Sequence, residues 1–90
     1  MISRTTPEFW EDYDELPERI QRKAREQFAI FEEDSGHPSL RFKQIDRGRG
    51  LWSARVTQDY RAAAFKLEDC YLWFFIGTHA EYDKLLAGKG

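Results

Sequence analysis

The sequence predicts an α+β domain, with two N-terminal helices packed on a mainly antiparallel sheet of four strands and a short C-terminal helix. Two observations predict this class. Apolar residues recur with a helical period in the N-terminal third of the chain. Three later segments, 51–56, 60–67 and 70–77, are rich in β-branched and aromatic residues and are separated by short polar connections.

The first helix is predicted over about residues 7–14. Thr6 is a suitable N-cap, and Pro7 fits the first helical turn. One side of this helix is aromatic, with Phe9, Trp10 and Tyr13. Pro17 marks the break before the next helix.

The second helix is predicted from Pro17 to about Glu33. Its inward residues recur with a helical period and are Ile20, Ala24, Gln27, Phe28 and Phe31. We expect Phe28 and Phe31 to point into the core. The sequence 34–38 ends the helix, because a glycine is followed by His37-Pro38.

Residues 40–45 alternate weakly between apolar and polar and predict a strand, and residues 46–50 form a flexible basic loop. Residues 1–6 could add a further short strand. The helices should cover one sheet face. The other face then has only the short C-terminal helix to cover it, so we expect function there.

Register decides where the two arginines of this sheet, Arg55 and Arg61, point. A two-residue loop, 58–59, puts them on opposite faces, whereas a three-residue loop, 57–59, places them directly opposite each other. We favour the longer loop because it gathers the apolar side chains on the helix side: Trp52, Ala54, Val56, Ala62 and Ala64. If 68–69 is a two-residue turn, Trp73 and Phe75 join that side.

Like charges opposite each other destabilise a sheet. A structural role for the arginine pair needs a nearby carboxylate, such as Asp59 or Glu81. The functional interpretation is an anion site, and phosphate is the natural ligand of two guanidinium groups. Residues 37–66 carry seven basic and two acidic side chains, although the whole chain has a net charge of −2.

At the end of the last predicted strand, Thr78 is a suitable N-cap and Glu81 completes a capping box. His79 then reads simply as a first-turn residue, and Tyr82 as an aromatic that anchors the helix. Neither residue type indicates a catalytic role from spacing alone.

Length and composition limit the remaining possibilities. Residues 1–90 should form one domain, since 41% hydrophobic content suits a folded core of modest size. A single cysteine, Cys70, fits a reducing cytoplasm, and no signal-peptide or transmembrane pattern is present. No metal-ligand spacing or cofactor motif appears, so we expect neither a metal nor a cofactor.

Several short runs, taken in order, resemble the RelE/ParE superfamily of bacterial type II toxin–antitoxin toxins. They are Phe9-Trp10, Leu16-Pro17, His37-Pro38-Ser39-Leu40, Phe42-Lys43, Leu51-Trp52-Ser53-Ala54-Arg55-Val56, Asp59-Tyr60-Arg61 and Ile76-Gly77-Thr78-His79-Ala80-Glu81-Tyr82. The resemblance covers nearly the whole chain and implies a single RelE/ParE-like toxin domain, neutralised by a cognate antitoxin.

Many such toxins cleave mRNA on the ribosome without a metal, using basic residues on a concave sheet face. The resemblance therefore implies catalytic roles for Arg61, His79 and Tyr82, and phosphate or RNA binding by Arg55 and Lys43. Two alternatives stay open. The chain could inhibit gyrase by contact, as on the ParE side of the family, or be an orphan member without toxicity.

Overall fold

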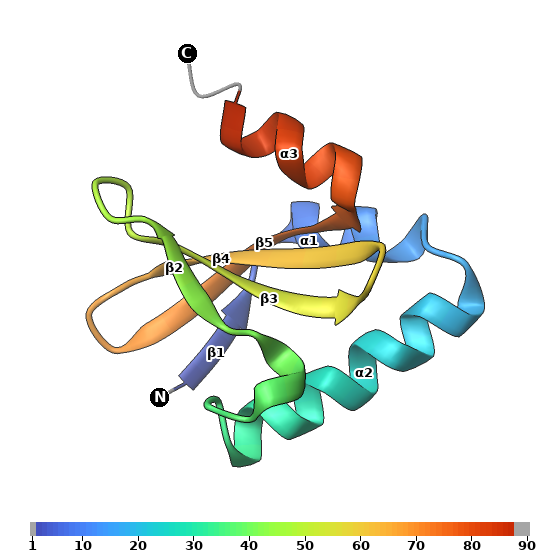
Figure 1. Ribbon diagram of the computed structural model, residues 1–90, viewed down its shortest axis with the longest axis horizontal. Helices are drawn as coiled ribbons and strands as arrows, with labels where there is room; N and C mark the ends of the chain where they lie inside the picture. Colours follow the sequence, from blue (N-terminus) through green and yellow to red (C-terminus); the bar gives the residue numbers. More distant parts are fainter. Residues whose placement is uncertain (1, 88–90) are drawn as a thin grey trace.

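The computed structural model describes residues 2–87 (Figure 1). The predicted α+β class is confirmed. Along the chain the elements are β1 (Ile2–Thr5), α1 (Pro7–Asp14), α2 (Glu18–Glu33), the 3-10 turn η1 (Pro38–Leu40), β2 (Lys43–Asp46), β3 (Leu51–Thr57), β4 (Tyr60–Lys66), β5 (Cys70–Thr78) and α3 (His79–Ala87).

The sheet has five strands rather than the four predicted, in the order β1-β5-β4-β3-β2. The additional strand is β1, which pairs in parallel with β5, from Ile2 opposite Cys70 to Thr5 opposite Trp73. The other pairs are antiparallel. Because β1 lies at an edge, it needs few apolar side chains, and its sequence gave only a weak strand signal.

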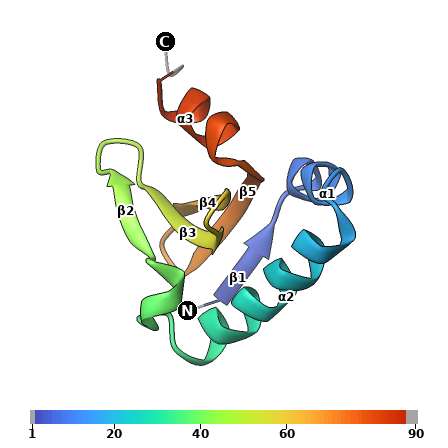
Figure 2. The same cartoon turned by 45° about the vertical axis from the view of Figure 1, so that its right-hand side comes forward.

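Helices α1 and α2 lie together on one side of the sheet, and α3 lies apart from them beyond the end of β5 (Figure 2). The Thr6 hydroxyl accepts a hydrogen bond of 3.1 Å from the backbone N–H of Phe9 and caps α1 as predicted. None of the helices in residues 2–87 combines the length and apolar character needed to cross a membrane.

The core between the helices and the sheet contains the apolar set that register arguments predicted. Its buried members are Ile20, Phe31, Leu40, Ala54, Val56, Ala62, Ala64, Tyr71, Trp73 and Ile76. Trp52 is half-buried and stacks on Phe42 with 4.9 Å between ring centroids. Small alanines on two central strands leave room for the large rings of α2 and β5.

Phe28 was predicted to point into this core, and that prediction is wrong. Its side chain is 42% exposed, whereas Phe31 is buried. Positions 20, 27 and 31 form the buried stripe of α2, and residue 28 lies about 100° around the helix from Gln27. Phe28 therefore lies on the flank of α2.

Two β-bulges change the predicted register. In the β3–β4 pair, Arg55 faces Arg61 and Thr57 faces Tyr60, so Val56 is the extra residue. The loop is thus the two-residue turn 58–59, yet the arginines are opposite each other as predicted. The bulge at Val56 allows a two-residue turn and a direct pairing of Arg55 with Arg61 to occur together.

The second bulge lies in β5. The turn at residues 68–69 has two residues as predicted, because the Leu67 N–H donates to the Cys70 carbonyl at 2.8 Å. Ala64 then faces Trp73, but Ala63 faces Phe75, so Phe74 is the extra residue. Phe75 consequently lies on the face away from α1 and α2, and the prediction that it joins the helix side is wrong.

Candidate functional site

Three of the sequence-predicted cations share the sheet face that α1 and α2 leave uncovered. Arg55 and Arg61 are direct cross-strand partners, and Lys43 faces Ser53, two residues before Arg55 on β3. Paired residues and residues two apart on a strand point to the same face. Lys43 is exposed on the edge strand β2, whereas both arginines are half-buried.

The Arg61 guanidinium is fastened to the β3–β4 hairpin. Its Nη1 donates to the carbonyl oxygens of Thr57 at 2.6 Å, Gln58 at 3.1 Å and Tyr60 at 3.0 Å. No salt bridge joins Arg61 to Asp59 or Glu81 in the described part of the chain. Backbone carbonyls, rather than the carboxylates we considered, thus give this arginine its structural partners.

The surroundings of Arg61 are rich in positive charge. Burial, and then the nearby guanidinium of Arg55, lower the pKa of Arg61 below its ordinary value. Arg41 lowers this pKa further, whereas Tyr82 and Asp59 raise it. Arg61 still stays protonated at any physiological pH. Its Nε and Nη2 make no hydrogen bond within residues 2–87, so their N–H groups can donate to an anionic ligand.

Helix α3 starts next to Arg61. Gly77 faces Arg61 and Thr78 faces Tyr60, so the helix begins one residue beyond this pairing. The His79 N–H donates to the Asp59 carbonyl at 2.7 Å, which ties the start of α3 to the β3–β4 turn.

The predicted capping box at the start of α3 is confirmed. The Thr78 N–H donates to Glu81 Oε1 at 2.9 Å, and the Glu81 N–H donates to Thr78 Oγ1 at 3.1 Å. This reciprocal pair fixes the direction of the first helical turn.

His79 and Tyr82 contact each other on this turn. Their rings meet edge to face with centroids 5.8 Å apart. Tyr82 is buried, whereas the His79 side chain is half exposed and its Nδ1 lies 3.2 Å from Asp83 Oδ2. A carboxylate at Nδ1 orients the imidazole and leaves Nε2 for another partner.

The chemistry available here is the binding of an oxyanion and the transfer of a proton. Two arginines supply charge and hydrogen-bond donors, and an exposed imidazole lies on the neighbouring helical turn. No group of three or more His, Cys, Asp or Glu side chains in residues 2–87 is arranged to hold a metal ion.

Comparison with protein families decides the classification. A model described as the ParE-like toxin domain matches residues 18–84, which include all five predicted site residues. The chain belongs to the ParE-like toxin family. It is therefore a toxin-type domain of the RelE/ParE superfamily, as the sequence runs indicated.

Solved structures show that this ParE-like domain shares its fold with several toxins. RelE, in the RelB–RelE antitoxin–toxin complex from Methanococcus jannaschii, has 12% sequence identity and a TM-score of 0.73, with 91% of this chain and 96% of that one covered. YafQ from Escherichia coli has 13% identity and a TM-score of 0.70, covering 89% and 94%. A YoeB/ParE toxin from Agrobacterium tumefaciens has 16% identity and a TM-score of 0.67, covering 88% and 99%. Among curated proteins, none matches the sequence significantly.

One cation near the site was not singled out from the sequence. Arg41 was predicted to lie in a strand over residues 40–45, but it follows η1 in a left-handed conformation with φ of 45°. The prediction failed because Leu40 belongs to η1, where it is buried. The alternation of apolar and polar residues over 40–45 therefore does not reflect a strand that begins at Leu40. The breaker His37-Pro38, only three residues before Arg41, was the available signal.

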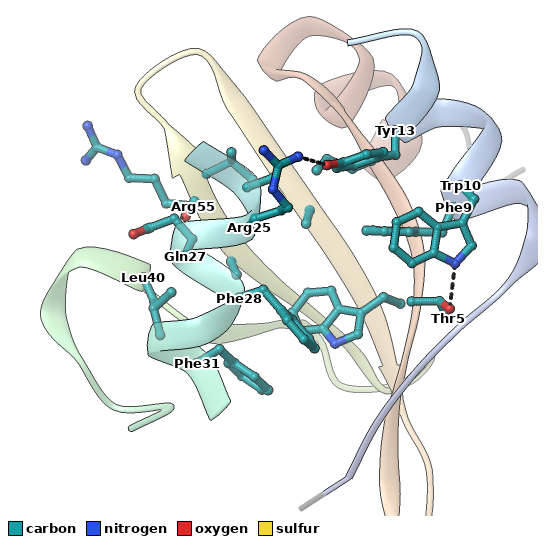
Figure 3. Close-up of a pocket in the computed structure, with 16 residues that line it drawn as sticks. Thr5, Phe9, Trp10, Tyr13, Arg25, Gln27, Phe28, Phe31, Leu40 and Arg55 are labelled. Atoms are coloured by element: carbon teal, nitrogen blue, oxygen red, sulfur yellow. Dashed lines mark hydrogen bonds between the residues drawn. The ribbon is translucent and has the colours of Figure 1, made fainter. Parts of the chain in front are cut away.

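A separate apolar cavity of about 340 Å³ lies on the helix-covered side of this ParE-like domain (Figure 3). Phe28, Phe31 and Trp10 line it, and Arg25 Nη1 donates to the Tyr13 hydroxyl at 2.6 Å. Arg55 also borders this cavity, but its side chain points away from it (Figure 3). The cavity and the basic face are therefore different surfaces.

Proposed function

We propose that this ParE-like domain is a cytoplasmic toxin that stops translation by cutting mRNA on the ribosome, without a metal. The observation that carries the proposal is the position of Arg55 and Arg61 opposite each other, with α3 beginning beside them. A like-charged pair weakens a sheet, and neither arginine has a carboxylate partner within residues 2–87. An anionic ligand would offset this repulsion.

The proposed reaction is attack of an RNA 2′-hydroxyl on the adjacent phosphate. Arg55 and Arg61 hold the phosphate and stabilise the charge that builds on its oxygens in the transition state. The 2′ oxygen bonds to phosphorus as the bond from phosphorus to the 5′ oxygen breaks. His79 either takes the proton from the attacking hydroxyl or gives a proton to the leaving 5′ oxygen. Tyr82 contacts the His79 ring and orients it.

Lys43 lies on the same face, one strand further toward the sheet edge, and would bind a phosphate outside the reacting one. It would act as a compact charge, without the two-pronged geometry of a guanidinium.

The proposed partner of this face is a cognate antitoxin. Solved structures named as RelB–RelE complexes and as a DinJ–YafQ toxin–antitoxin complex contain chains with this fold. An acidic antitoxin segment would complement the net charge of +5 on residues 37–66 and would compete with RNA for the arginines. We expect the protein encoded beside this chain to co-purify with it.

Contact inhibition of gyrase is the second candidate. It is favoured by the ParE-like character of the matching family model and by the net charge of −2, which is unlike that of a general RNA-binding protein. The hydrogen bonds from Arg61 to the hairpin carbonyls also give this arginine a structural role that does not require RNA.

Expression of the unaltered chain and its variants in growing cells, followed by mapping of RNA ends, tests the proposal. Arg61→Ala should lower cleavage by about 10²–10³-fold. His79→Ala should lower it by about 10²–10⁴-fold. Arg4→Ala and His37→Ala are matched controls, because both residues are exposed and lie outside the site. Both controls should leave cleavage unchanged.

Because Arg61 also binds three carbonyls, its variant needs a test of folding. Arg61→Lys retains the charge and is the second variant, and thermal unfolding of each protein reports on the hairpin. If growth arrest persists in folded Arg61→Ala and His79→Ala while RNA stays intact, catalysis is refuted. Supercoiling by purified gyrase then tests the contact mechanism.

A further inference from the structure

A second hollow opens at the edge of β3, where β2 no longer covers it. The last β2–β3 pair at this end is Lys43 with Ser53, whereas β3 continues to Thr57. The hollow has a volume of about 480 Å³. Cations from three separate elements line it: Lys23 of α2, Arg41 after η1, and Arg55 of β3.

A buried amide holds the walls of this hollow together. Gln27 is only 6% exposed, and its Nε2 donates to the carbonyl oxygens of Arg55 at 2.9 Å and Ser39 at 3.2 Å. One side chain of α2 thus fastens both β3 and the η1 turn. The three cations are positioned by packed backbone and not by a mobile loop.

Arg41, which lines the hollow, has an uncommon backbone conformation. Its φ of 45° lies in the left-handed region, and Arg41 is the one non-glycine residue within 2–87 that has a positive φ. Non-glycine residues with positive φ concentrate at functional sites, where surrounding structure holds them in place. Here that structure places a guanidinium beside two other cations.

The positive charge of the hollow is poorly balanced. No acidic residue is among the described residues that line it. Lys23 has a partner at the rim, because its Nζ lies 3.7 Å from Glu26 Oε1, and both side chains are about half exposed. Arg41 and Arg55 have no ion pair or hydrogen bond through their side chains within residues 2–87.

We propose that this hollow binds a backbone phosphate of single-stranded RNA, next to the phosphate held by Arg61. The inference rests on the proposed function, since Arg55 borders both the hollow and the proposed site of the reacting phosphate. RNA fits better than a peptide, because three of the residues that line the hollow are cations and none is a large aromatic anchor of the kind that dominates protein interfaces. Guanidinium groups suit phosphate through paired hydrogen bonds.

The test measures binding without cleavage. A fluorescein-labelled single-stranded RNA with 2′-O-methyl groups cannot attack its own phosphate, and fluorescence anisotropy gives its affinity as a function of salt. Loss of one phosphate contact should reduce the slope of log K against log salt by about 0.7. We expect this reduction for Arg41→Gln and little change for Arg41→Lys.

Two further variants separate charge from folding. Arg41→Gly removes the charge but suits a positive φ, so it should lose the same slope while its thermal midpoint stays unchanged or rises. Arg4→Gln is the matched control. Arg4 is exposed and lies on β1, at the opposite edge of the sheet, where it pairs with Leu72 of β5. Its slope should equal that of the unaltered protein.

An unchanged slope for Arg41→Gln and Arg41→Gly overturns the inference, and so does a lack of RNA binding at low salt. A poly-glutamate peptide is the comparison ligand. If its binding depends on Arg41 while RNA binding does not, the hollow is assigned to an acidic protein segment instead. The proposed function fails separately. If RNA in cells stays intact while the Arg41 slope effect persists, catalysis is refuted and the phosphate subsite stands.

Discussion

Gly77 lies in β5, two residues before α3 begins, and replacing it tests how the start of α3 is held. An ideal Cβ at Gly77 would lie 2.5 Å from Glu81 Oε1 and 3.0 Å from Phe75 Cζ. The same Oε1 accepts the 2.9 Å hydrogen bond from the Thr78 N–H. Gly77→Ala should therefore displace the Glu81 carboxylate and break half of the capping box.

The expected energies follow from these contacts. Loss of the Glu81 cap should cost about 1 kcal/mol. The φ of Gly77 is not positive, so alanine causes no backbone strain there; it restricts the unfolded chain and so returns about 0.5 kcal/mol. Gly77→Ala should thus lower the free energy of unfolding by about 0.5 kcal/mol, and Glu81→Ala by about 1 kcal/mol. The double variant should also lose only about 0.5 kcal/mol, because no cap remains to displace.

Urea unfolding of the four proteins measures a coupling free energy, expected to be about 1 kcal/mol. Gly48→Ala with Glu81→Ala is the matched control. A Cβ at Gly48 meets only Asp46 Oδ1, at an ordinary 3.5 Å, so this pair should be additive. If Gly77→Ala and Glu81→Ala are also additive, the carboxylate is not held over Gly77 as described.

Three other predictions test the fold. Gln27→Leu leaves two carbonyls without their donor and should cost about 1–3 kcal/mol in urea unfolding. Burial raises the pKa of Asp12 above 3.8, with nearby carboxylates adding to the shift, so the native state binds that proton more tightly than the unfolded chain does. Asp12→Asn should therefore raise the free energy of unfolding above the native pKa and lose this gain below pH 3.8. Deletion of either extra residue, Phe74 or Val56, should leave the flanking strand pairs intact, and deletion of Val56 should cost more because Val56 is buried; a shifted pairing in either deletion variant would contradict the assigned bulges.

Local sequence signals predicted the elements that local forces determine. Thr6 and Pro7 marked the start of α1, and Thr78 with Glu81 marked the start of α3. The two-residue turn at 68–69 also followed from short-range pattern. In each case the signal and the contact that it predicts lie within a few residues of each other.

The features that the sequence did not predict depend on contacts between residues that are distant in sequence. The pairing of β1 with β5 joins residues about 70 positions apart, and no local pattern specifies a parallel edge strand. Arg41 has its positive φ as the C-cap of η1, and this turn is held in place by Leu40, which is buried in the core. Phe28 lies on the flank because Gln27, a polar residue, takes the buried position to bind two carbonyls.

The two bulges explain why the candidate site could be predicted although the strand register was partly wrong. With strict alternation from Trp73, Gly77 would point toward the helices; the extra residue Phe74 turns it to the face of Arg61. With strict pairing across the 58–59 turn, Arg55 and Arg61 would be on opposite faces; the extra residue Val56 prevents this. One extra residue lies in β3 and the other in β5, the two strands that flank β4. Both change which face the residues near Arg61 point to. Together they place two arginines and the first turn of α3 on one face, which regular strands of these lengths would not do.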